Sequence, residues 1–119
     1  DKNKITIINP PNKLKQFNCV FTETHEQTLK VLSLNGIYFH ASEFETVGLP
    51  LYEAQELGLK IVVPDKSYSK YFLSDHIYLY NYKNTEDAIR KIHDAGIVGE
   101  DYIFANSYSE NWGKILDKI

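Results

Sequence analysis

Short apolar runs, rich in β-branched residues, alternate along the chain with stretches in which apolar residues recur every three or four positions. The short runs predict strands, and their almost continuous apolar character is typical of buried parallel strands. Each run is followed by a turn signal or by a helical stretch, so the pattern predicts an α/β fold with a mainly parallel sheet. The predicted strands cover residues 4–8, 18–21, 37–40, 60–65 and 76–80.

Helix-boundary residues support the helices expected between these strands. Thr24 and Gln27 have the spacing of a capping box, in which each side chain binds the backbone N–H of the other residue. Pro50 suits a first helical turn, where its missing N–H costs nothing, and Gly58 is typical of a C-terminal cap. The expected helices cover residues 24–35, 50–58 and 84–96, and a last one runs from about 109 to the end.

Composition indicates an ordinary globular domain, because 43% of the 119 residues are hydrophobic and 24% are charged. The net charge of −3 argues against a nucleic-acid-binding protein, which is normally basic. A single cysteine, Cys19, excludes an internal disulfide framework and a cysteine-based metal site. We find no linker or repeat, so residues 1–119 are interpreted as one domain. The chain contains no methionine, so we expect it to be part of a longer polypeptide.

Two glutamates flank the expected start of the second helix. Glu45 lies in the preceding loop and Glu53 lies one turn inside the helix, with Gly48 between them. Unpaired N–H groups at a helix start favour a phosphate, and carboxylates accept hydrogen bonds from sugar hydroxyls. These residues therefore indicate a nucleotide or sugar phosphate at the carboxyl ends of the strands. On spacing alone, a structural role is an equally good interpretation, because the helix dipole itself favours glutamate in a first turn.

The segment His40–Ala54, HASEFETVGLPLYEA, closely resembles the signature of retaining GT-B glycosyltransferases of the GT4 group. The family pattern is a small residue and Ser after a strand, then Glu-Gly-Phe-Gly-Leu-Pro-x-x-Glu-Ala. The likeness continues through the strand IVVPD at 61–65, the helix at 84–92 and Trp112, and covers roughly residues 18–117. It implies a Rossmann-like, donor-binding domain that forms most of the C-terminal half of a two-domain enzyme.

The resemblance implies a role for each matching residue. Glu45 matches the glutamate that faces the donor sugar and helps to stabilise the transferring glycosyl group, so it is the expected catalytic residue. Glu53 matches the glutamate that binds the ribose hydroxyls, and the segment 21–24 would lie near the base. Thr46 and Val47 replace the usual Gly and Phe, so the fit of the sugar is expected to differ. The amides expected to contact the donor sugar and diphosphate belong to Thr46, Val47, Gly48 and Leu49.

The same resemblance implies the activity of the whole enzyme, which would transfer a sugar from a nucleoside diphosphate sugar with retention at the anomeric carbon. No metal or other cofactor is expected, since the family needs no metal bound by Asp-x-Asp and the chain has no such motif. The lysine-rich residue usage fits an AT-rich bacterial gene for surface polysaccharide (O-antigen, capsule or lipopolysaccharide) biosynthesis.

The family's phosphate-clamping Arg and Lys and its N-terminal domain have no counterpart in the chain. This chain alone is therefore expected to be inactive. A glycan or lipid-linked acceptor would bind the missing N-terminal domain, which would also make any peripheral membrane contact. The expected location is the cytoplasm, including the inner face of the plasma membrane.

Two other classes of function stay open. A GT-B sugar-nucleotide epimerase would use the same pocket but would need acid–base residues of its own, and the sequence assigns none. A non-catalytic, glycosyltransferase-like interaction domain would not need both Glu45 and Glu53. The histidines lack metal-ligand spacing, and His40, at the end of a predicted strand, is interpreted as a hydrogen-bonded structural residue. No dinucleotide fingerprint, Walker A sequence or Gly-x-Ser-x-Gly elbow is present.

Overall fold

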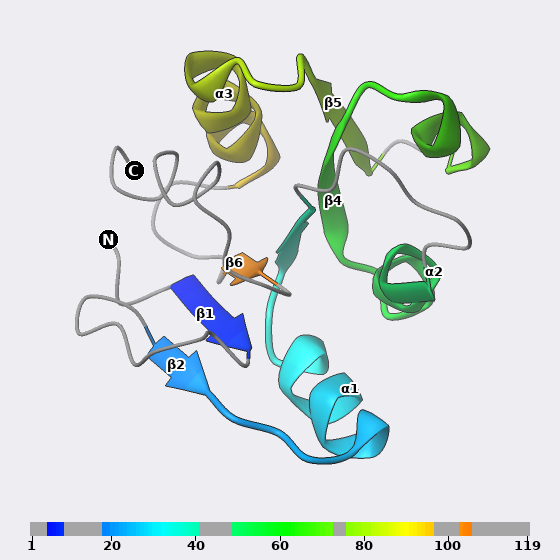
Figure 1. Ribbon diagram of the computed structural model, residues 1–119, viewed down its shortest axis with the longest axis vertical. Helices are drawn as coiled ribbons and strands as arrows, with labels where there is room; N and C mark the ends of the chain where they lie inside the picture. The colour runs from blue at the N-terminus through cyan, green and yellow to red at the C-terminus, as the bar shows by residue number, and fades with distance from the viewer. Residues whose placement is uncertain (1–4, 9–17, 41–48, 73–75, 97–102, 106–119) are drawn as a thin grey trace.

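In a computed structural model, the described part of the chain comprises residues 5–8, 18–40, 49–72, 76–96 and 103–105. Its strands are parallel and form one sheet in the order β2-β1-β6-β3-β4-β5 (Figure 1). The fold is therefore α/β and Rossmann-like, as the alternation of apolar runs and helical stretches predicts. The strands are β1 Ile5–Ile8, β2 Asn18–Val20, β3 Ile37–Phe39, β4 Lys60–Pro64, β5 Ile77–Tyr80 and β6 Ile103–Ala105.

The strands predicted from the apolar runs are present, and each begins and ends within one residue of its expected bounds. All residues of β3 are buried, as expected for a strand covered on both faces. β6 is not predicted, because three residues carry too little pattern to indicate a strand. β6 is a strand because it pairs with strands on both sides: Ile103 lies opposite Ile5 of β1 and Ile37 of β3.

Helices cover both faces of this sheet. α1 (His25–Ser33) and α2 (Leu49–Glu56) pack on one face, and α3 (Thr85–Ala95) packs on the other (Figure 1). Successive side chains of a strand point to opposite faces, so Tyr38 packs with α1 and α2 whereas Phe39 packs with α3. The result is a three-layer core with β3 and β4 at its centre.

The boundaries of α2 match their sequence signals. Pro50 is the second residue of the helix, and because it has no backbone N–H, it needs no hydrogen-bond acceptor there. Gly58 has a φ of +78°, its N–H donates to the carbonyl of Gln55, and the N–H of Leu59 donates to the carbonyl of Ala54. These two bonds form a Schellman motif, and the buried side chains of Leu59 and Ala54 pack in the same apolar cluster. The expected glycine cap is confirmed.

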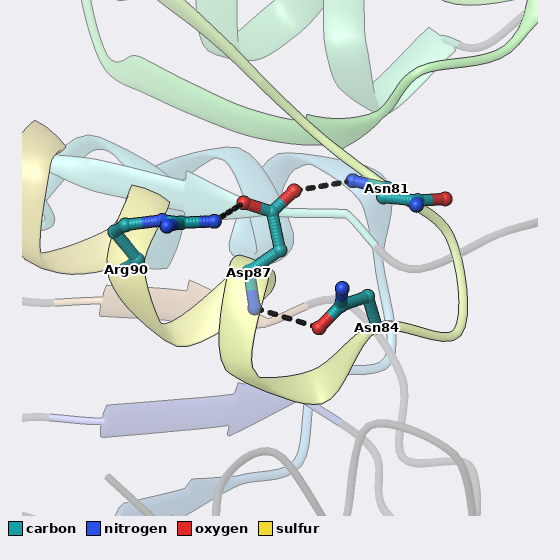
Figure 2. A network of polar contacts seen from close by, with 4 residues as sticks. All are labelled: Asn81, Asn84, Asp87 and Arg90. Carbon is teal, nitrogen blue, oxygen red and sulfur yellow. Dashed lines mark hydrogen bonds and ion pairs between the residues drawn. The ribbon is translucent and has the colours of Figure 1, made fainter.

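α3 begins with a network of polar contacts that Figure 2 shows. Asn84 is the N-cap, and its side-chain oxygen accepts a hydrogen bond of 3.0 Å from the N–H of Asp87. The carboxylate of Asp87 accepts a bond of 2.7 Å from the N–H of Asn81 and pairs with Arg90. These bonds lower the pKa of Asp87, the backbone bond from Asn81 contributing most. The network fixes the turn between β5 and α3.

One further described element is not predicted from the sequence, and one expected element lies outside the described residues. A short 3₁₀ helix, η2 (Ser67–Tyr71), follows β4 and is not predicted. The helix expected from about residue 109, with Trp112, lies outside the described residues. Within the described ranges, every helix is too short or too polar to cross a bilayer.

Candidate functional site

The winding of the sheet reverses between β1 and β3. The chain passes from β1 to its neighbour β2 at one edge, whereas β3, β4 and β5 follow one another towards the opposite edge (Figure 1). β6 occupies the position between the two directions. In open α/β sheets, ligands bind outside the carboxyl ends of the strands at such a reversal. α1 follows β2 and α2 follows β3, so both helices begin on this side of the sheet.

The structure describes only part of the site expected from the sequence. Glu45, Thr46, Val47 and Gly48 lie outside the described residues. Leu49 is the first residue of α2, and Glu53 lies one turn further along the same helix. The geometry of the candidate site therefore rests on Glu53 and on the residues that surround it.

Glu53 pairs with His25, the first residue of α1. The distance between Glu53 Oε1 and His25 Nε2 is 3.2 Å. The glutamate side chain is 20% exposed and the histidine side chain is 67% exposed, so the carboxylate is the more sheltered partner. The contact joins the first part of α2 to the start of α1. It places a carboxylate and an imidazole together at the edge where a ligand is expected.

The sequence did not indicate His25 as a site residue. Its signal was indirect: His25 directly follows Thr24, the cap of a helix that begins beyond the carboxyl end of β2. The capping box is present, because Gln27 N donates to Thr24 Oγ1 at 3.2 Å and Thr24 N donates to Gln27 Oε1 at 3.3 Å. This cap fixes the backbone on both sides of His25 and so fixes the position of the Cα atom from which the imidazole side chain extends.

α2 holds Glu53 in place through its apolar face. Leu51 and Ala54 are both fully buried against the sheet, and they lie on either side of Glu53 in the sequence. Their burial fixes the rotation of the helix, which leaves Glu53 at the border between core and solvent. The Schellman motif at Gly58 fixes the far end of the same helix.

His40 follows β3 and is 4% exposed. Its Nδ1 lies 2.9 Å from the hydroxyl oxygen of Tyr38, and its backbone carbonyl accepts a hydrogen bond of 3.0 Å from the hydroxyl of Tyr80. Burial raises the pKa of Tyr80, and the neighbouring Tyr68 and Tyr82 raise it further, so the hydroxyl remains a donor. The hydrogen bonds expected for His40 are present. These bonds fix the point at which the chain leaves β3 towards Glu45.

A second polar region follows β5, the edge strand next to β4. Residues 82–86 line an open depression of about 420 Å³, and the ammonium group of Lys66 lies 4.7 Å from the centre of the Tyr82 ring. β5 is an edge strand, and β4 separates it from β3, so this depression lies outside the reversal between β1 and β3 in the sheet order. Within the described ranges, no group of three or more His, Cys, Asp or Glu side chains is arranged to hold a metal.

Comparison of the chain with protein-family models, with curated proteins and with solved structures found no match. The class of this protein is accordingly described from its fold and from the geometry around Glu53 alone. The described part of the chain is a Rossmann-like α/β domain with a sheltered carboxylate, paired with an imidazole, on the helix that follows β3.

Proposed function

We propose that the chain is the donor-binding half of a retaining glycosyltransferase, which transfers a sugar from a nucleoside diphosphate sugar to an acceptor. The observation that carries the proposal is the position of Glu53. Its half-buried carboxylate lies one turn inside α2, a helix that begins at the carboxyl end of β3, beside the reversal of the sheet. The resemblance of residues 40–54 to the glycosyltransferase signature supports the same conclusion.

In this proposal, each group near α2 meets a different part of the donor. Glu53 accepts hydrogen bonds from the ribose hydroxyls, for which a carboxylate is a strong acceptor. The unpaired N–H groups and the dipole at the start of α2 favour the diphosphate. Glu45, from the segment before α2, stabilises the positive charge that develops on the transferring sugar.

Phe21 supports a nucleotide rather than a simple sugar phosphate. It directly follows β2, it is 60% exposed, and only three residues separate it from His25, the partner of Glu53. An exposed aromatic ring at this edge offers a face on which a base can stack. Base, ribose and diphosphate would then follow one another from β2 to the start of α2.

The remaining parts of the proposal concern the whole enzyme. The acceptor, a glycan or a lipid-linked glycan of bacterial surface-polysaccharide biosynthesis, binds the N-terminal half. That half also makes any contact with the inner face of the plasma membrane. No metal cofactor takes part, because backbone amides and helix dipole stabilise the diphosphate.

The test is an NMR titration of the chain with UDP, GDP and ADP. We expect signals of α2 to shift with one of these nucleotides, and the shifts to be lost in Glu53→Gln. Glu56→Gln is the matched control, because Glu56 is an exposed glutamate of the same helix. Without the family's phosphate clamp we expect millimolar affinity, about −4 kcal/mol.

Equal binding to Glu53→Gln and to the unmodified chain would contradict the proposal. If the chain shows no shift, the same titration is repeated with the full-length protein, and silence there would overturn the proposal. A transfer assay with the full-length protein then distinguishes the transferase from a sugar-nucleotide epimerase, which would interconvert the donor without an acceptor.

A further inference from the structure

We draw no further inference here: the strongest candidate, the open depression that residues 82–86 line at the start of α3, with Lys66 beside the Tyr82 ring, is a helix N-terminus already capped by Asn84, and nothing in the described part of the structure shows what ligand it would hold.

Discussion

The hydroxyl of Tyr80 donates a hydrogen bond to the backbone carbonyl of His40, a residue 40 positions earlier in the chain. Tyr80 ends β5 and His40 follows β3, and β4 lies between the two strands. The bond therefore ties together the carboxyl ends of alternate strands. It fixes the exit of β3, from which the chain continues to the segment that carries Glu45.

Removal of this hydroxyl tests how much the tie contributes. Tyr80→Phe is expected to lower the free energy of unfolding by about 1–2 kcal/mol, because a buried hydrogen bond is lost while the ring still packs. Urea unfolding followed by circular dichroism measures the change. Tyr71→Phe, at an 82% exposed tyrosine, is the control and should change stability by less than about 0.5 kcal/mol. Equal stability of Tyr80→Phe and the unmodified protein would show that the bond contributes nothing.

The same tyrosine makes stability depend on alkaline pH. Burial raises the pKa of Tyr80, so the folded protein keeps a proton that the unfolded chain releases near pH 10. Its stabilising contribution is complete below about pH 10 and is lost as the pH rises towards the higher folded value. The free energy of unfolding, measured between about pH 8 and 11, should fall less steeply in Tyr80→Phe. Identical slopes would contradict the burial of an un-ionised hydroxyl.

At the start of α3, stability is lost at acidic rather than at alkaline pH. The pKa of Asp87 is lowered mainly by the hydrogen bond from the N–H of Asn81 and next by the contact with Arg90. The ionised carboxylate therefore stabilises the fold fully above its unfolded pKa of about 3.9. This stabilisation is lost as the pH falls through the lower pKa of the folded state. Asp87→Asn should destabilise the protein by about 1–2 kcal/mol at pH 7 and reduce this acid dependence. Asp94→Asn, at an exposed aspartate of the same helix, should have a much smaller effect. Thermal unfolding at pH 3 to 7 distinguishes the two variants.

Gly58 tests the end of the helix that carries Glu53. With a φ of +78°, Gly58→Ala is expected to cost about 1–2 kcal/mol, although no atom lies within 4 Å of the added methyl group. Gly58→Asn should cost less, since asparagine tolerates this conformation. Guanidinium unfolding of the two variants gives the comparison. A larger loss in the asparagine variant would mean that space, rather than backbone conformation, limits this position.

Local sequence signals predicted most of the described fold, and non-local contacts account for the rest. The apolar runs, the Thr24 capping box and Gly58 each determine structure within a few residues of themselves. The strands and helix ends that they specify can therefore be predicted from the sequence. β6 depends on partners from distant parts of the chain. The contact between His25 and Glu53 depends on the packing of α1 beside α2, which no local pattern encodes. The sequence therefore indicated the carboxylate of the candidate site but not the imidazole beside it.

The strand order also has a consequence for the synthesis of this protein. A ribosome releases the chain from its N-terminus, so β1 with β2, and β3 with β4 and β5, emerge before the strand that lies between them. Until residues 103–105 follow, the inner edges of β1 and β3 each lack their partner strand. Before β6 is made, the nascent chain thus holds two separate half-sheets, β1–β2 and β3–β4–β5. Chaperones that shield unpaired strand edges would act at that stage.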